Sequence, residues 1–127
     1  MLVKEFAEQH DGRPGGRVVL FTSGQHLAPM RREVPYAVSK GALHQATMTL
    51  SEELIDRGIT VNIVNPGPTD TGWAITDVDP SPAMPLGRWG QPDDAARLVA
   101  WLCTDDGNWI TGQVIDSEGG LRRWALR

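Results

Sequence analysis

RVVLFT at residues 17–22 is a continuous apolar run with β-branched residues, and ITVNIV at residues 59–64 is a second stretch that reads as a strand. Such runs are typical of strands that are buried on both faces of a sheet. Between them, residues 35–57 place apolar side chains three or four positions apart, which is the spacing of one helix face. A strand, a helix and a strand joined by short turns form a right-handed βαβ unit. The pattern therefore predicts an α/β fold with a parallel sheet covered by helices.

The flanking segments add two helices and one short strand. Residues 1–10 carry apolar positions at helical spacing, and Pro92 opens a second stretch of this kind with two acids in its first turn. Residues 111–115 read as a last short strand, whereas residues 69–91 form a long Pro- and Gly-rich loop of the kind that is usually functional or disordered. About three strands with flanking helices are half of a doubly wound, Rossmann-like sheet. We therefore expect one partial domain spanning residues 1–127.

Composition narrows the class of protein. The chain has 127 residues, of which 40% are hydrophobic and 22% charged, and its formal net charge is -4. This composition is that of a soluble globular domain, and the lack of a Lys/Arg-rich run gives no reason to expect nucleic acid or a membrane surface as a partner. The single cysteine, Cys103, cannot form an internal disulfide, which favours a cytoplasmic location.

YAVSK at residues 36–40 is the segment that carries the most chemistry. A spacing of four places the phenol of Tyr36 and the ammonium of Lys40 one turn apart on the same helix face. A phenol ordinarily ionises at a pH near 10, so it catalyses proton transfer poorly unless a nearby cation favours its anion. Lys40 can supply that cation. The alternative is a helix whose Tyr caps a core and whose Lys is solvated.

Two polar segments follow the two strands. Ser23 comes directly after the first strand, and Asn65, Pro66 and Gly67 come directly after the second. Ligands of open α/β sheets bind beyond the carboxyl ends of the strands, where these residues are expected. The Ser23 hydroxyl could bond the same substrate oxygen that the tyrosine protonates. Ordinary turn formation remains the alternative for both segments.

These motifs, taken in order, resemble the short-chain dehydrogenase/reductase family. The similarity covers nearly the whole chain and includes PLGRWGQP at residues 85–92, ITGQ at residues 110–113 and EGG at residues 118–120. The resemblance implies an oxidoreductase that transfers hydride between NAD or NADP and a small carbonyl or alcohol substrate. It also implies a homo-oligomer, a dimer or tetramer, with Ala42, Ala46 and the region of Leu98 and Trp101 as candidate contact surfaces.

The resemblance also assigns roles to individual residues. Ser23 resembles the serine that positions the substrate oxygen, Tyr36 the proton donor and acceptor, and Lys40 the lysine that favours the tyrosinate and binds the nicotinamide ribose. Cofactor contacts are implied for Tyr36, Lys40, Pro66, Gly67 and Thr69. The loop over residues 70–90 resembles the family's substrate lid, in which Trp73 and Trp89 either contact substrate or simply pack.

Several parts of the family pattern are missing from these residues. There is no glycine-rich turn after a first strand, no early Asn-Ala-Gly segment and no active-site asparagine; Asn62 and Asn65 occur in another context. We therefore expect the catalytic half of such an enzyme. The alternative is an inactive truncated fragment that binds no cofactor alone and acts through association with other chains. In either case the apolar strand at residues 17–22 is expected to expose an edge that promotes aggregation.

Two other classes of site are disfavoured. A serine hydrolase using Ser23 and His26 would lack a Gly-x-Ser-x-Gly elbow. A metal site is not expected because His10, His26 and His44 are scattered and the chain has one cysteine. His44, one turn after Lys40, is expected on the helix surface.

Overall fold

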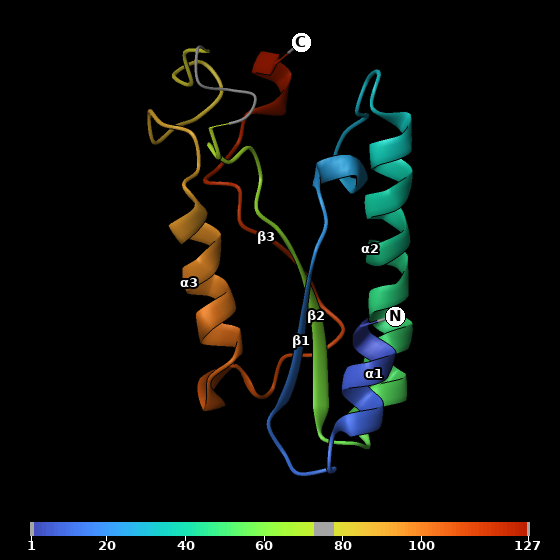
Figure 1. Ribbon diagram of the computed structural model, residues 1–127. Helices are drawn as coiled ribbons and strands as arrows, with labels where there is room; N and C mark the ends of the chain where they lie inside the picture. Colours follow the sequence, from blue (N-terminus) through green and yellow to red (C-terminus); the bar gives the residue numbers. More distant parts are fainter. Residues whose placement is uncertain (1, 73–77, 127) are drawn as a thin grey trace.

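A computed structural model describes residues 2–72 and 78–126 and contains a three-stranded sheet with helices on both faces. The fold is α/β and Rossmann-like, as the sequence predicts (Figure 1). The main elements are α1 (Leu2–Gln9), β1 (Gly16–Phe21), α2 (Val34–Ile55), β2 (Ile59–Asn65), α3 (Pro92–Leu102) and β3 (Val114–Asp116). Three short 3-10 turns complete the set: η1 (Gly24–His26), η2 (Asp105–Gly107) and η3 (Arg123–Leu126).

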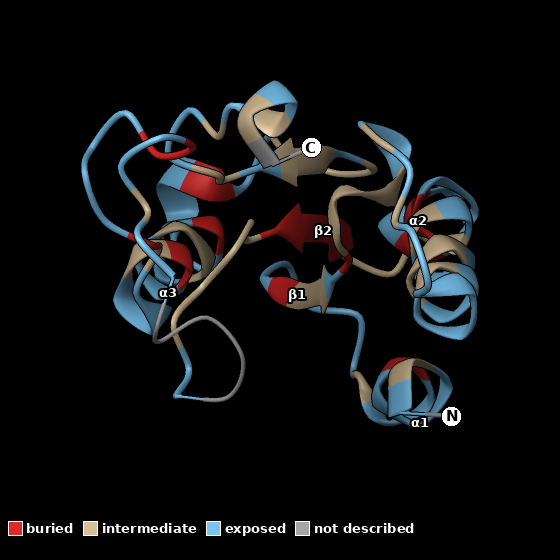
Figure 2. Ribbon diagram, turned by 90° about the horizontal axis from the view of Figure 1, so that it is seen from above, coloured by how far each residue is buried: buried red, intermediate tan, exposed pale blue. Residues whose placement is uncertain are grey.

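The strands are parallel and lie in the order β1-β2-β3, so β2 is central. β1 pairs with β2 along its whole length, from Gly16 opposite Ile59 to Phe21 opposite Val64. Helices α1 and α2 lie on one face of the sheet and α3 lies on the other (Figures 1 and 2). Because β2 has a strand on each side and helices on each face, all seven of its residues are buried.

One hydrophobic cluster of the core lies between β2 and the helices α1 and α2. Ala7, Leu54, Ile59 and Val61 form its buried cluster, and Val3, Val18 and Leu50 pack against them. The apolar face predicted for α2 serves as core only over its C-terminal part, where Thr47, Ser51 and Leu54 are buried. Nearer its N-terminus, Leu43 and Tyr36 are exposed. One face of α2 therefore runs from the core to the rim of the sheet.

The last strand is shorter than predicted, because it begins at Val114 and not at Thr111. Residues 111–113 still bond to β2, but irregularly: the Thr111 hydroxyl accepts from Val61 N–H (3.0 Å), and Gly112 N–H donates to the Val61 carbonyl (2.7 Å). Gly112 has a φ of +70°, a left-handed conformation that interrupts an extended ladder. The buried Asn62 side chain adds bonds to Ile110 and Gln113. A mixture of side-chain bonds and irregular backbone bonds therefore replaces a regular ladder there.

Of the helices in the described part of the chain, none is both long and apolar enough to cross a membrane.

Candidate active site

The carboxyl ends of β1 and β2 meet at one rim of the sheet. The ladder continues for one bond beyond β1, because Thr22 N–H donates to the Val64 carbonyl (2.9 Å). Ser23 follows directly and caps the start of η1, with an extended backbone. Pro66 follows the end of β2. The two segments that the sequence singles out therefore lie side by side at the edge where open α/β sheets bind ligands.

Lys40 ties the first turns of α2 to the end of β1. Its Nζ donates to the Phe21 carbonyl (3.2 Å), and its own carbonyl accepts from Thr22 Oγ1 (3.1 Å). Tyr36 lies one turn earlier with 43% of its surface exposed, and Lys40 Nζ is 5.8 Å from its ring centroid. The structure thus brings the exposed side chain of Tyr36, the ammonium of Lys40 and Thr22, the residue before Ser23, to the same rim.

The turn after β2 is held by its own polar groups. Gly67 has a φ of +67°, and its N–H donates to Asn65 Oδ1 (3.1 Å). The Thr69 hydroxyl lies 3.5 Å from the Pro66 carbonyl and 3.3 Å from the Gly67 carbonyl. Pro66, Gly67 and Thr69 are all partly exposed at the rim. Their contacts with a cofactor remain a prediction.

A polar network beneath this turn was missed by the sequence reasoning. Asn65 Nδ2 donates to Asp116 (2.7 Å) and to Glu118 (2.6 Å), and Glu118 is paired with Arg123. Asp116 also contacts His26 Nε2 (3.2 Å). The only signal in the sequence is the acidic run DSE at residues 116–118 directly after the last strand. Asn65 and His26 lie about 50 residues or more away from this run, so spacing gives no access to them, whereas Arg123 follows Glu118 by five residues.

The two tryptophans assigned to the lid have different outcomes. Trp73 lies outside the described residues. Trp89 is 8% exposed, packs with Ala83 and Met84, and donates its indole N–H to the Val78 carbonyl (2.9 Å). These contacts are those of a packed side chain, and a contact between Trp89 and substrate remains a prediction.

His44 does not lie on an open helix surface as expected. It is half-buried, and its ring meets that of His26 edge-on at 4.8 Å between centroids. Its Nδ1 is shielded from solvent and has no hydrogen-bond partner within the described part of the chain. His26 in turn pairs with Asp116, and no hydrogen bond joins it to Ser23 among residues 2–72 and 78–126. Nothing in this arrangement supports a serine hydrolase.

The N-terminus of α3 is held near the same rim by a short bridge and by side-chain hydrogen bonds. Thr69 and Gly90 form a parallel bridge, and the Arg88 guanidinium forms two bonds to Asp94 (2.7 and 3.0 Å). Asp94 also accepts from Gln91 N–H (2.7 Å), which completes a capping box at the first turn of α3. These bonds, with that from Arg88 the strongest, lower the pKa of Asp94 well below its ordinary range.

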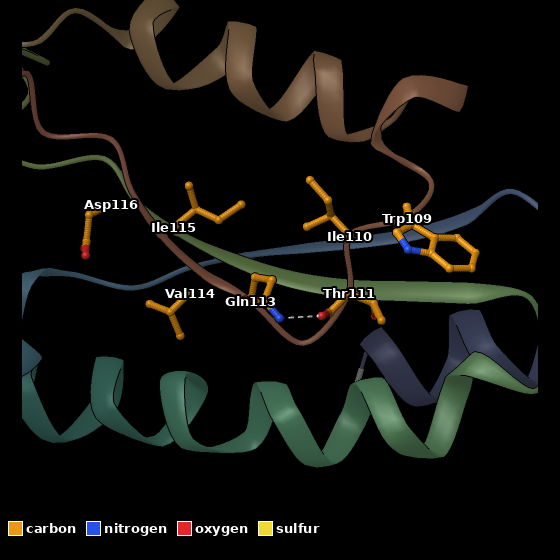
Figure 3. Close-up of a pocket in the computed structure, with 7 residues that line it drawn as sticks. All are labelled: Trp109, Ile110, Thr111, Gln113, Val114, Ile115 and Asp116. Atoms are coloured by element: carbon orange, nitrogen blue, oxygen red, sulfur yellow. Dashed lines mark hydrogen bonds between the residues drawn. The ribbon is translucent and has the colours of Figure 1, made fainter.

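A shallow depression of about 550 Å³ lies along the outer side of β3 (Figure 3). It is lined by Trp109, Ile110, Thr111, Gln113, Val114, Ile115 and Asp116, and neither Ser23 nor Tyr36 contributes to it. All lining residues come from one stretch of chain, and Trp109 is 98% exposed. Among residues 2–72 and 78–126, the depression therefore follows the edge of the sheet at β3, which pairs with no further strand, and it is separate from the candidate catalytic residues.

Comparison with known proteins covers almost the whole chain. Residues 1–122 match a family model described as enoyl-(acyl carrier protein) reductase. The chain is 53% identical over 110 residues to the uncharacterized oxidoreductase YjdA of Bacillus subtilis, which corresponds to 85% of this chain and 44% of that protein. It is 34% identical over 127 residues to human dehydrogenase/reductase SDR family member 4, covering 94% of this chain and 46% of that protein.

Solved structures give the same relationship. The angucycline C-6 ketoreductase LanV with bound NADP aligns with a TM-score of 0.75 at 40% identity, over 84% of this chain and 44% of LanV. A 3-ketoacyl-(acyl-carrier-protein) reductase of Brucella melitensis complexed with NADH aligns with a TM-score of 0.79 at 29% identity, over 94% of this chain and 49% of that structure. The chain thus spans about half the length of these relatives.

Proposed function

Because this chain belongs to the short-chain dehydrogenase/reductase family, we propose that its rim residues perform the acid–base part of hydride transfer between a nicotinamide cofactor and a carbonyl or alcohol. The observation that supports this most directly is the placement of Tyr36 and Lys40. They lie one turn apart on α2, and Lys40 is bonded to the end of the strand that precedes Ser23. This placement supports a site in which Tyr36 is the proton donor, Lys40 the cation and Ser23 the serine of the family pattern.

Tyr36 is assigned the proton. Reduction of a carbonyl places negative charge on oxygen, and an exposed phenol can deliver a proton to that oxygen. The Lys40 ammonium favours the phenolate that is left behind, because an adjacent cation stabilises an anion. In the oxidation direction the same phenolate accepts the proton of the alcohol.

Ser23 and the Pro66–Gly67 turn are assigned to orientation. The Ser23 side chain makes no capping bond to η1, which leaves its hydroxyl to bond the substrate oxygen. The turn and Thr69 are assigned to contact the nicotinamide part of the cofactor. Interactions that strengthen as charge develops on oxygen lower the barrier more than those that only bind substrate.

The residues present fit one end of a dinucleotide. An ammonium has three N–H donors, and Lys40 uses one of them on the Phe21 carbonyl, so two can serve the ribose hydroxyls. Bound NAD or NADP would supply or accept the hydride. For the pyrophosphate, the sequence offers no glycine-rich turn after a strand. The choice between NAD and NADP lies outside the residues assigned here.

The alternative proposal is a fragment that binds no cofactor alone and acts through association with other chains. The share of the relatives that the chain spans, about half, is the observation that favours it. A homo-oligomeric enzyme, a small carbonyl or alcohol as substrate, and a cytoplasmic location remain parts of the main proposal. The single exposed Cys103 supports that location, because it has no disulfide partner in the sequence.

A hybrid enzyme tests the main proposal. Residues 1–127 replace the matching half of Bacillus subtilis YjdA, and reduction of a panel of small ketones and aldehydes is followed with NADH and NADPH. Tyr36→Phe removes only the hydroxyl, and we expect kcat to fall by a factor of about 10² or more. Thr49→Ala, at an exposed position of α2, is the matched control and should retain normal kcat.

Two results would count against these assignments. If Tyr36→Phe kept a tenth of the kcat of the unsubstituted hybrid, Tyr36 would not be the proton donor. If the 127-residue chain alone bound NADH or NADPH with micromolar affinity in isothermal titration, the fragment proposal would be wrong.

A further inference from the structure

The network beneath the rim contains one charge pair that is partly shielded from solvent. Both guanidinium Nη atoms of Arg123 contact the two carboxylate oxygens of Glu118, with 2.6 Å between Nη1 and Oε2. The Glu118 side chain is 9% exposed and that of Arg123 is 24% exposed. An arginine that bonds a carboxylate with two parallel N–H groups fixes direction as well as distance.

Asn65 connects this pair to the turn after β2. Its side chain, 1% exposed, donates to Glu118 (2.6 Å) and to Asp116 (2.7 Å), and its Oδ1 accepts from Gly67 N–H (3.1 Å). The backbone carbonyl of Asn65 also accepts a hydrogen bond from Ser117 N–H (2.8 Å). The orientation of the Asn65 amide, and with it the Gly67 N–H, therefore depends on where the two carboxylates are held.

Two glycines bring the rim into direct contact with the pair. A Cβ on Gly67 would lie 3.0 Å from Glu118 Cα, and a Cβ on Gly24 would overlap the Arg123 guanidinium. Gly24 directly follows Ser23, and Gly67 lies in the turn assigned to the nicotinamide. The ion pair is thus in contact with both segments of the candidate site.

We propose that the Arg123–Glu118 pair is a positioning device, which holds the Ser23–Gly24 segment and the Pro66–Gly67 turn at a fixed separation. This inference rests on the proposed function, because that separation matters only if one segment binds substrate and the other binds cofactor. An ion pair that is largely withdrawn from water contributes little net stability, and its role here is to specify geometry, since each charge needs its partner in one place. The two parallel N–H groups of the guanidinium fix this geometry more than the positive charge does. Lysine at position 123 therefore cannot replace arginine.

Amide exchange on the 127-residue chain tests the device without any cofactor. In Arg123→Met, the Gly67 N–H should exchange about tenfold faster, as expected for the loss of one hydrogen bond. Gly24→Ala should act in the same direction, because its methyl group displaces the guanidinium while both charges remain. Arg122→Met, at an exposed neighbour with no ion pair in the described part of the chain, is the control and should leave the rate unchanged. Gly67 exchange within twofold of the unsubstituted chain in both test variants would overturn the proposal.

Kinetics of the YjdA hybrid supply the second readout. Arg123→Met and Arg123→Lys should raise KM for cofactor and for carbonyl by about fivefold or more, because both sites shift while Tyr36 stays in place. A merely structural role would reduce the amount of active enzyme, lowering apparent kcat and leaving KM unchanged, and that result would also overturn the proposal. Faster Gly67 exchange in a hybrid without any turnover would instead leave the positioning device standing and refute the proposed function.

Discussion

β1 and β2 have similar sequences but very different surroundings. Both are apolar runs, and they pair residue for residue over six positions. β2 has strands on both sides and is buried throughout, whereas β1 has one strand partner among the described residues and ends with Phe21 40% exposed (Figure 2). An apolar run therefore predicts a strand, but the number of neighbours decides how much of it is buried.

This difference bears on how the chain is expected to behave in solution. β1 leaves its second row of backbone donors and acceptors without a strand among residues 2–72 and 78–126. An apolar edge of this kind can pair with another chain. The backbone of β2 is paired on both sides and cannot bond to another chain in this way. The contribution of β2 to the stability of the fold therefore depends on how its side chains pack.

The largest expected effect comes from truncating the same residue type in the two strands. Val61 and Val18 are paired in register, but Val61 is fully buried and Val18 only partly. Val61→Ala should lower the free energy of unfolding by roughly 2–3 kcal/mol, because it removes buried carbon and leaves a cavity. Val18→Ala should cost about 1 kcal/mol or less, as fewer contacts are lost. Urea denaturation of both variants measures the difference, and equal costs would show that β1 is as enclosed as β2.

A smaller effect should follow from placing a charge on the open edge. Val19→Lys in β1 should reduce self-association, because lysines on edge strands discourage pairing with another chain. Light scattering at increasing protein concentration measures this. The control is Met48→Lys, at an exposed position of α2, which adds the same charge outside β1 and should not reduce association. If both variants scattered alike, net charge and not the β1 edge would govern association.

The smallest effect concerns the helix that covers β2 on the side away from α2. Because the pKa of Asp94 is lowered by its bonds from Arg88 and Gln91, its ionised form stabilises the folded chain. That contribution is present above the unfolded-state pKa, near 3.9 for aspartate, and is lost as the pH falls through the folded value. Asp94→Asn should therefore lower Tm slightly at pH 7 and progressively less below about pH 4. Asp93→Asn, at an exposed position beside it, should change Tm less; equal shifts at every pH would refute the assignment.

The sequence predicts the elements well because each depends on local pattern. The bounds of α2 and β2 agree with the expected helix and strand to within one or two residues. The sequence predicts a last strand that is longer than β3, because residues 110–113 bond to β2 through the Asn62 and Thr111 side chains and irregular backbone bonds, which no periodicity records. The shielding of His44 was missed for the same reason, since its neighbour His26 comes from another segment.

In the candidate site, too, the sequence predicts the residues that depend on local pattern and not those that depend on tertiary contacts. Ser23, Tyr36 and Lys40 could be chosen from strand ends and from helical spacing, which are local features. The residues that support them could not be chosen in this way, because Arg123 and Glu118 contact Gly24 and Asn65 only in the folded chain. The assigned roles of these residues stay predictions until variants are measured.

The single apolar face of α2 also sets a rotational phase. Thr47 and Leu54 fix how the helix is turned against the sheet, and Tyr36 takes its direction from them. An α-helix turns by about 100° per residue, so one residue inserted between Lys40 and Thr47 would swing Tyr36 and Lys40 together by about that angle. The core and the composition would be almost unchanged, yet the phenol would leave the rim. We therefore expect related chains to keep the length of this interval even where its residues differ.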